Sequence, residues 1–118
     1  MFVLILLATL QAPVPLPTIE AKTPKDLAMV LSVNEALSTL SQKVTACVDA
    51  GRPVESCRCS YPKELTALRT KYDDAITARP EWKDQLVSYQ YVNKEGRNIS
   101  GTMVFQNLRR ELDTLKCS

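Results

Sequence analysis

Residues 45–62 read TACVDAGRPVESCRCSYP, and this stretch contains the features that decide the fold. Gly51 and Pro53 end a helical pattern, because glycine favours the position just after a helix and proline cannot continue one. Pro62 suits the first turn of the next helix. The same stretch holds three of the four cysteines of the chain. We therefore predict a corner between two antiparallel helices, fastened through sulfur.

The patterns on both sides of this corner are helical. Before it, apolar residues recur at alternating spacings of three and four: Val30, Val33, Leu37, Leu40, Val44 and Cys47. After it, a second stripe has spacings of three or four: Leu65, Leu68, Tyr72 and Ile76. Thr23 can cap the start of the first helix. Pro80 disfavours helical structure at Arg79, so the second helix should end near Ala78. The sequence predicts helices over 24–50 and 62–78 that form an αα-hairpin, joined by a loop.

In the C-terminal third of the chain, the spacing of apolar residues changes from the helical three or four to two. Apolar and polar residues alternate around Val87, Tyr89 and Tyr91, which is typical of a half-buried strand. The sequence of residues 93–96, which ends in a glycine, is typical of a tight turn. We predict that residues 98–102 form the second strand of a hairpin. A final helix is predicted over 104–116 by a stripe at helical spacing: Phe105, Leu108, Leu112 and Leu115. The expected fold is mainly α, in the order α-α-β-β-α, with the hairpin packed on the helices.

The cysteines predict two disulfides that staple this fold. Their number is even, and a Cys57–Cys59 bridge would close a small strained ring. Two pairings remain: Cys47–Cys57 with Cys59–Cys117, or Cys47–Cys59 with Cys57–Cys117. In either pairing, chain entropy gives about 3 kcal/mol for the short loop and about 4 kcal/mol for the long one. Loop entropy therefore leaves the pairing open.

A metal site is the alternative use of these thiols. The Cys57-Arg58-Cys59 motif offers two thiolates, which bind copper or zinc well. The spacing lacks the paired C-x2-C knuckles of a four-cysteine zinc site. The chain has no histidine, which excludes histidine ligands and Ser-His-Asp or Cys-His catalysis. We favour disulfides and expect no metal and no cofactor.

The amino terminus indicates export. Residues 1–12 are apolar at ten positions, which is about half of the ~20 residues that cross a bilayer. Such a run is typical of a secretory signal peptide, although no basic residue precedes it and no A-x-A site follows. An uncleaved segment would instead tether the domain to a membrane. Residues 13–23 predict a proline-rich extended linker, and 24–118 one small domain. We expect a periplasmic or secreted protein.

Charge and carboxylates give little support for other functions. The net charge of +2 and the pI near 8.4 do not favour nucleic acid as a partner. Glu64, Asp73 and Asp74 are the carboxylates considered for acid–base catalysis. Neighbouring residues on a helix diverge by about 100°, so Asp73 and Asp74 do not face one substrate. We expect that the protein is not an enzyme.

Three aromatic residues cluster around the predicted hairpin: Trp82, Tyr89 and Tyr91. Tyrosine and tryptophan are common anchors of protein interfaces. The alternation of Tyr89 and Tyr91 with polar neighbours favours a contribution to the core, and Trp82 should pack on the helices with the apolar face of the hairpin. The sequence therefore predicts a binding or accessory module, with these aromatics as candidate contacts for an unidentified protein partner.

Overall fold

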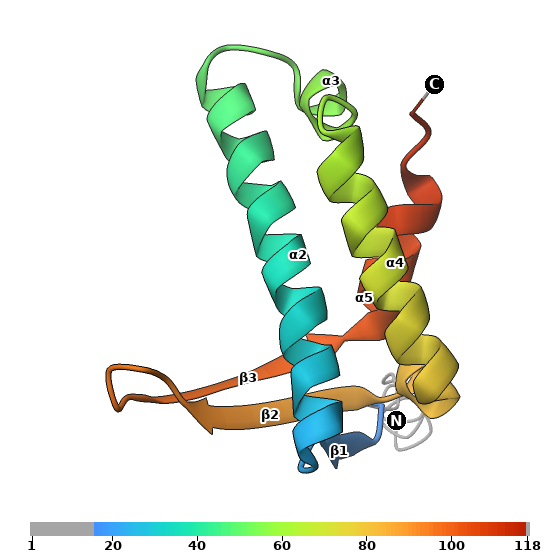
Figure 1. Cartoon of the computed structure of the whole chain (residues 1–118). Helices are drawn as coiled ribbons and strands as arrows, with labels where there is room; N and C mark the ends of the chain where they lie inside the picture. Colours follow the sequence, from blue (N-terminus) through green and yellow to red (C-terminus); the bar gives the residue numbers. More distant parts are fainter. Residues whose placement is uncertain (1–15, 118) are drawn as a thin grey trace, which may run out of the picture.

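The computed structural model describes residues 16–117 of the chain, so the prediction for segment 1–12 lies outside the described residues. The elements in chain order are β1 (Thr18–Glu20), α2 (Pro24–Asp49), α3 (Val54–Arg58), α4 (Pro62–Ala78), the 3₁₀ helix η1 (Pro80–Asp84), β2 (Leu86–Val92), β3 (Asn98–Val104) and α5 (Phe105–Thr114). Figure 1 shows α2 and α4 side by side, α5 behind α4, and the sheet across one end of the helices. The predicted mainly α fold, with its order of helices and hairpin, is confirmed.

The two long helices begin and end where their local sequence requires. The Thr23 hydroxyl accepts a hydrogen bond from the Asp26 backbone N–H at 3.1 Å, which caps α2. Gly51 follows α2 with φ of 95°, a conformation that glycine adopts without a steric penalty. The Arg79 side chain, just after α4, donates to the Asp26 carboxylate at 3.0 Å. That hydrogen bond raises the pKa of Arg79 and ties the end of α4 to the start of α2.

Residues 13–15 of the predicted extended linker 13–23 lie outside the described residues, and Thr18–Glu20 within it is extended and forms an edge strand of the sheet. It pairs in parallel with the start of β2. The Leu86 N–H donates to the Pro17 carbonyl at 2.9 Å, and the Ala21 N–H donates to the Ser88 carbonyl at 2.8 Å. A three-residue strand carries no periodic signal of its own, so its pairing depends on β2. The short helices α3 and η1 also lie where the sequence analysis predicted none.

The predicted hairpin is confirmed, and its second strand extends to Val104. β2 and β3 pair antiparallel over seven positions in continuous register, with Tyr89 opposite Gly101. Gly96 has φ of 77° in the turn, as a tight hairpin requires. The Asn93 side chain accepts from the Arg97 N–H at 2.9 Å and closes the turn. The strand order is β1-β2-β3, so β3 is an edge strand.

The core lies where the sheet, α5 and the helical hairpin meet. Trp82 and Phe105 stack with ring centroids 5.4 Å apart, and Tyr72 lies 5.9 Å from Phe105. All three side chains are almost fully buried. They join the hairpin end of the fold to α4, because Trp82 comes from η1 and Phe105 begins α5. No helix of the described residues has the length and apolarity needed to cross a membrane.

Candidate functional site: a groove between α2 and α5

Both disulfides meet at the corner between the long helices. Cys47, near the end of α2, is bonded to Cys57 in α3, with Cα atoms 5.7 Å apart. Cys59 is bonded to Cys117, beyond the end of α5, with Cα atoms 5.4 Å apart. This is one of the two pairings that the sequence left open. No cysteine is free.

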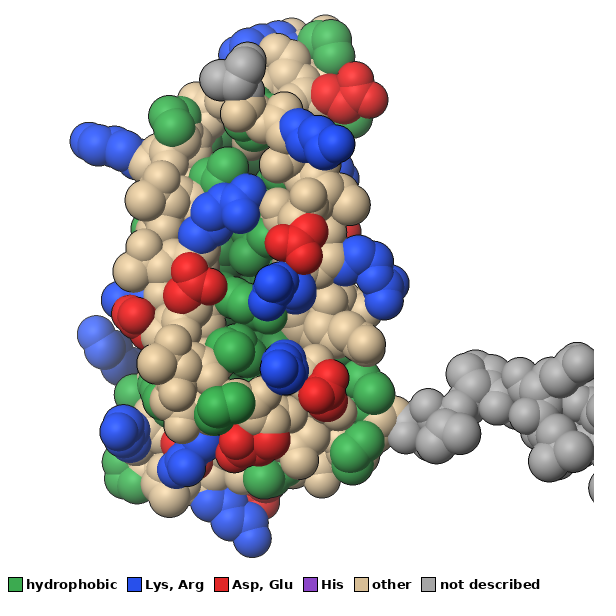
Figure 2. Space-filling view, turned by 90° about the vertical axis from the view of Figure 1, so that its right-hand side faces the viewer, with side chains coloured by type: hydrophobic (Ala, Val, Ile, Leu, Met, Phe, Trp, Pro, Cys, Tyr) green, Lys and Arg blue, Asp and Glu red, His purple; other side chains and the backbone are tan. Residues whose placement is uncertain are grey.

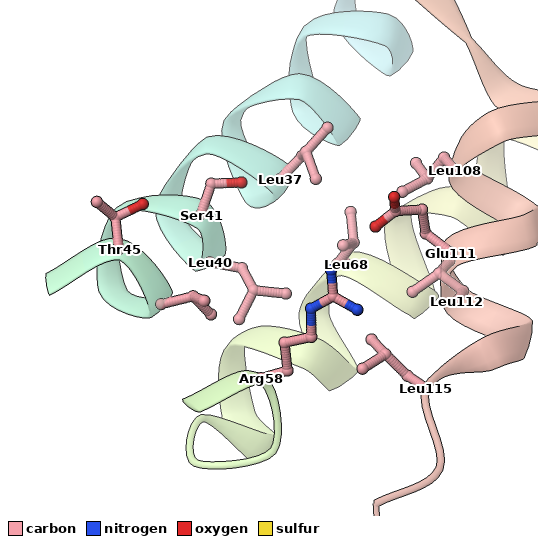
Figure 3. Close-up of a pocket in the computed structure, with 11 residues that line it drawn as sticks. Leu37, Leu40, Ser41, Thr45, Arg58, Leu68, Leu108, Glu111, Leu112 and Leu115 are labelled. Atoms are coloured by element: carbon pink, nitrogen blue, oxygen red, sulfur yellow. The ribbon is translucent and has the colours of Figure 1, made fainter. Parts of the chain in front are cut away.

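Arg58 is the residue between the two bridged positions, so a disulfide restrains the backbone on each side of it. One bridge leads to α2 and the other to the segment after α5. The Arg58 side chain lines a groove of about 210 Å³ between these helices. Figure 3 shows the guanidinium directed into the groove beside Leu68, with Leu115 on the other side.

The groove is mostly apolar, with two hydroxyl side chains and two charged ones. Its lining residues come from α2, α3, α4 and α5: Leu37, Leu40, Ser41, Val44, Thr45, Arg58, Leu68, Leu108, Glu111, Leu112 and Leu115. Leu40 and Leu68 form part of the core, whereas Leu37, Val44 and Leu115 are only partly buried. Within residues 16–117, Arg58 and Glu111 take part in no ion pair. The groove therefore combines leucine side chains with one guanidinium and one carboxylate, Arg58 and Glu111, neither of which has an ion-pair partner among the described residues.

Unequal helix lengths explain the opening. α2 has 26 residues and α5 has 10, about 39 Å against 15 Å at a rise of 1.5 Å per residue. α5 is too short to cover the apolar faces of α2 and α4 along their whole length. Figure 2, which views the side of the molecule that lies on the right in Figure 1, shows hydrophobic side chains in a band along the molecule, flanked by charged ones. Apolar surface thus stays accessible along the helices.

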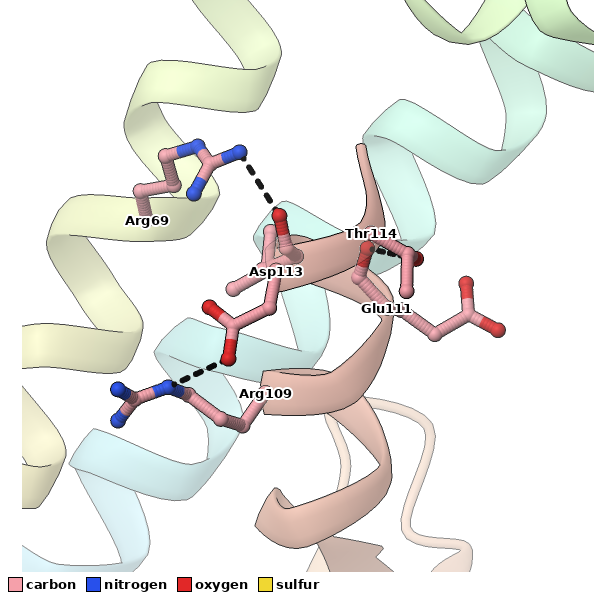
Figure 4. Close-up of polar contacts among 6 residues, drawn as sticks. Arg69, Arg109, Glu111, Asp113 and Thr114 are labelled. Carbon is pink, nitrogen blue, oxygen red and sulfur yellow. Dashed lines mark hydrogen bonds and ion pairs between the residues drawn. The ribbon is translucent and has the colours of Figure 1, made fainter. Parts of the chain in front are cut away.

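A polar cluster between α4 and α5 borders this region. Arg69 donates to the Leu112 carbonyl at 3.0 Å, and Arg109 donates to the Asp113 carboxylate at 3.1 Å. Figure 4 shows Arg69 extending from α4 toward the end of α5, and Arg109 on α5 itself. The nearby Tyr72 phenol, and then Asp113, raise the pKa of Arg109. The Tyr72 hydroxyl is buried and has no hydrogen-bond partner among the described residues. The Arg69 hydrogen bond fastens α5 to α4, whereas Arg109 and Asp113 form an ion pair within α5.

The three carboxylates considered for catalysis line different depressions. Glu64 lies between α2 and α4, where it accepts from Lys43 at 3.1 Å. Asp74 lines a second depression nearer the start of α2. Asp73 lines a third, between α4 and α5. The helix geometry that separates Asp73 from Asp74 in the sequence analysis thus separates them in space.

The thiolate metal site has no free donors in this structure. Cys57 and Cys59 point to different partners, and their sulfur atoms are bonded to those of Cys47 and Cys117. Within residues 16–117, no group of three or more histidine, cysteine, aspartate or glutamate side chains could hold a metal ion. The Cys57-Arg58-Cys59 motif therefore positions the arginine between two bridges.

The aromatic candidates have different environments. Trp82 is 2% exposed and stacks on Phe105, so it lies in the core, as expected for a side chain of the hairpin region that packs on the helices. Its large ring fills the junction between sheet and helices. Tyr89 and Tyr91 are half-buried on β2, and Tyr89 packs over Gly101 of the neighbouring strand. Partner contact by these two tyrosines stays a prediction.

Arg58 was not among the candidate residues predicted from the sequence, although it lies inside the Cys57-Arg58-Cys59 motif. Arg58 lies between two cysteines that belong to different bridges. The sequence shows that it lies between two cysteines, but only the disulfide pairing shows that each is bonded to a different segment. The helical stripes likewise identified Leu37, Val44 and Leu115 as apolar positions without showing that they stay partly exposed.

No protein-family model, curated protein or solved structure matches the chain.

Proposed function

We propose that the protein is an exported, disulfide-stabilised binding module whose groove between α2 and α5 takes an amphipathic helix of a protein partner. The observation that carries this proposal is Arg58, held between two disulfides at an apolar groove, with no ion-pair partner among the described residues. The partner helix would bring an apolar face for the leucines and a carboxylate for the guanidinium.

A helix suits the groove because its walls are helices. An added helix can place its side-chain ridge between α2 and α5, as neighbouring helices do in bundles. Arginine is enriched among residues that dominate interface energetics, and its guanidinium binds carboxylates with two parallel hydrogen bonds. The disulfides restrain the backbone on both sides of Arg58 before binding, which reduces the backbone conformational entropy lost when the complex forms.

Export is supported by the use of all four cysteines in disulfides. Such bridges form and persist in oxidising compartments and are rare in reducing ones. The two bridges also supply stability that a small core lacks. A binding module that works outside the reducing interior needs a rigid groove in that environment.

Selection from a library of helical peptides tests the groove. Oxidised protein is immobilised, and displayed helices with randomised surface positions are selected against it. We expect the enriched peptides to carry leucine-like residues at helical spacing next to aspartate or glutamate. With the variant Arg58→Glu, the charged position of the selected peptides should change to lysine or arginine, because the groove then has no positive charge and two carboxylates, the new one and Glu111.

The matched control is Arg110→Glu, which makes the same charge change at an exposed position of α5 outside the groove. Peptides selected by this variant should keep the acidic position. The proposal would be overturned if neither the wild-type protein nor Arg110→Glu enriched helical peptides. A peptide consensus that is the same for the wild-type protein and Arg58→Glu would also overturn it.

Mass spectrometry tests export. The gene is expressed from its own start codon in a bacterium with a periplasm, and the protein is recovered from the periplasmic fraction. We expect a shortened amino terminus and a mass four hydrogens below that of the reduced chain. A full-length chain with four free thiols in the cytoplasmic fraction would contradict export.

A further inference from the structure

The outer edge of β3 pairs with no other segment of residues 16–117. β3 (Asn98–Val104) pairs with β2 on one side only, because the described strands have the order β1-β2-β3. No backbone hydrogen bond joins residues 98–103 to a described segment beyond the β2 ladder. Figure 1 shows the hairpin projecting past α2, with its turn away from the helices. The exposed edge thus offers its unpaired backbone groups to another strand.

The sequence of this edge lacks the features that usually protect edge strands. Its seven residues, NISGTMV, include no charge and no proline, and its pairing with β2 has no bulge. Natural sheets normally use charges, prolines, bulges or very short strands to prevent pairing between molecules. The opposite edge, Thr18–Glu20, shows such protection, since it has three residues and ends on a glutamate. An unprotected edge of seven residues indicates that a strand pairs with it.

We propose that β3 pairs antiparallel with β3 of a second copy of this chain, with the two-fold axis at Gly101. This register places Ile99 opposite Met103 of the second copy, and Ser100 opposite Thr102 of the second copy. It also joins the two sheets into one of six strands. The proposal goes beyond the proposed function and does not involve the groove between α2 and α5.

The side chains match in this register. Met103 is opposite the buried Val87 of β2, so Met103 and Ile99 share the face of the sheet that carries the core. Ser100 and Thr102 are exposed on the other face. Across the two-fold axis, apolar side chains therefore meet apolar ones and hydroxyls meet hydroxyls. No like charges lie opposite each other in this register. Like charges would destabilise the pairing, whereas matched side chains stabilise it.

Gly101 suits the position on the axis. Neither strand presents a Cβ there, so the two backbones can approach closely. The ring of Tyr89 lies over Gly101 from the neighbouring strand. In the dimer, the two Tyr89 rings would flank the axis and cover the central backbone hydrogen bonds from solvent.

Paired charge variants test both the dimer and its register. Sedimentation velocity of the oxidised wild-type protein over a concentration series should show a monomer that becomes a dimer. In Ser100→Lys/Thr102→Lys, each lysine faces a lysine of the second copy, and the dimer should be lost. In Ser100→Lys/Thr102→Glu, each lysine faces a glutamate, and the dimer should remain. Two such pairs per dimer predict about a 30-fold difference in dissociation constant between these variants.

The control is Gln90→Lys, which places a charge on the same sheet face but on the central strand, opposite Ser100. This variant should dimerise like the wild type. Circular dichroism checks that each variant is folded before sedimentation. A wild-type protein that stays monomeric into the millimolar range would overturn the proposal. Equal dimerisation of the two double variants would also overturn it, because it would place the interface elsewhere.

Discussion

Cys59 and Cys117 are 58 residues apart in the sequence, yet their Cα atoms lie 5.4 Å apart. The bridge closes a loop that contains α4, the β2–β3 hairpin and α5. It joins the segment after α5 to the corner beside Arg58. The short Cys47–Cys57 bridge closes only the corner itself. The two bridges should therefore differ in both their energetic and their structural effects.

Removal of the long bridge should cost more stability. Cys59→Ala/Cys117→Ala should lower the free energy of unfolding by about 4 kcal/mol, and Cys47→Ala/Cys57→Ala by about 3 kcal/mol, because the longer loop gains more entropy in the unfolded chain. Urea unfolding of both variants measures the difference. Hydrogen exchange should become faster in α5 only when the long bridge is absent. A larger loss from the short bridge would contradict the entropic account.

The stacked pair at the centre of the fold predicts a large core effect. Phe105→Ala should lower the free energy of unfolding by about 3–5 kcal/mol, because it leaves a cavity beside Trp82 and Tyr72. Val92→Ala, at a residue 67% exposed, should change the stability by less than about 0.5 kcal/mol. Thermal unfolding followed by tryptophan fluorescence compares the two. A small effect of Phe105→Ala would show that this junction is not part of the cooperative core.

The close approach of Tyr89 to Gly101 predicts coupling between them. A Cβ at Gly101 would lie 2.7 Å from Cζ of Tyr89, so the ring must move. Gly101→Ala should therefore cost about 1–3 kcal/mol in the wild-type background. The cost should be smaller in the Tyr89→Ala background, because the ring is then absent. A double-mutant cycle by urea unfolding measures this coupling, and additive effects would rule it out.

The cap of α2 predicts a modest local effect. Thr23→Ala removes the hydroxyl that accepts from the Asp26 N–H and should cost about 1 kcal/mol. Thr23→Ser keeps an oxygen at this position and should restore most of the stability. Urea unfolding of the two variants separates the capping hydrogen bond from other effects of the substitution. Equal losses from both would assign the effect to the missing methyl group instead.

The helices and the hairpin were predictable because their signals are local. The α2 and α4 stripes repeat at helical spacing, and Thr23, Gly51 and Pro62 mark the boundaries. The alternation along β2 likewise indicates a strand wherever it packs. By contrast, β1 and α3 are too short for a period to appear. The burial of Trp82 depends on Phe105, which lies 23 positions later in the sequence.

The helical corner and the hairpin follow from the amino-acid sequence alone, because residue spacing and turn residues act over a few positions. The identity of the bonded sulfur atoms, the pairing of β1 with the sheet and the placement of Arg58 at the groove follow from the three-dimensional fold. Each of these depends on the relative placement of segments distant along the chain. Loop entropy could not choose the cysteine pairing, since both alternatives close loops of similar length.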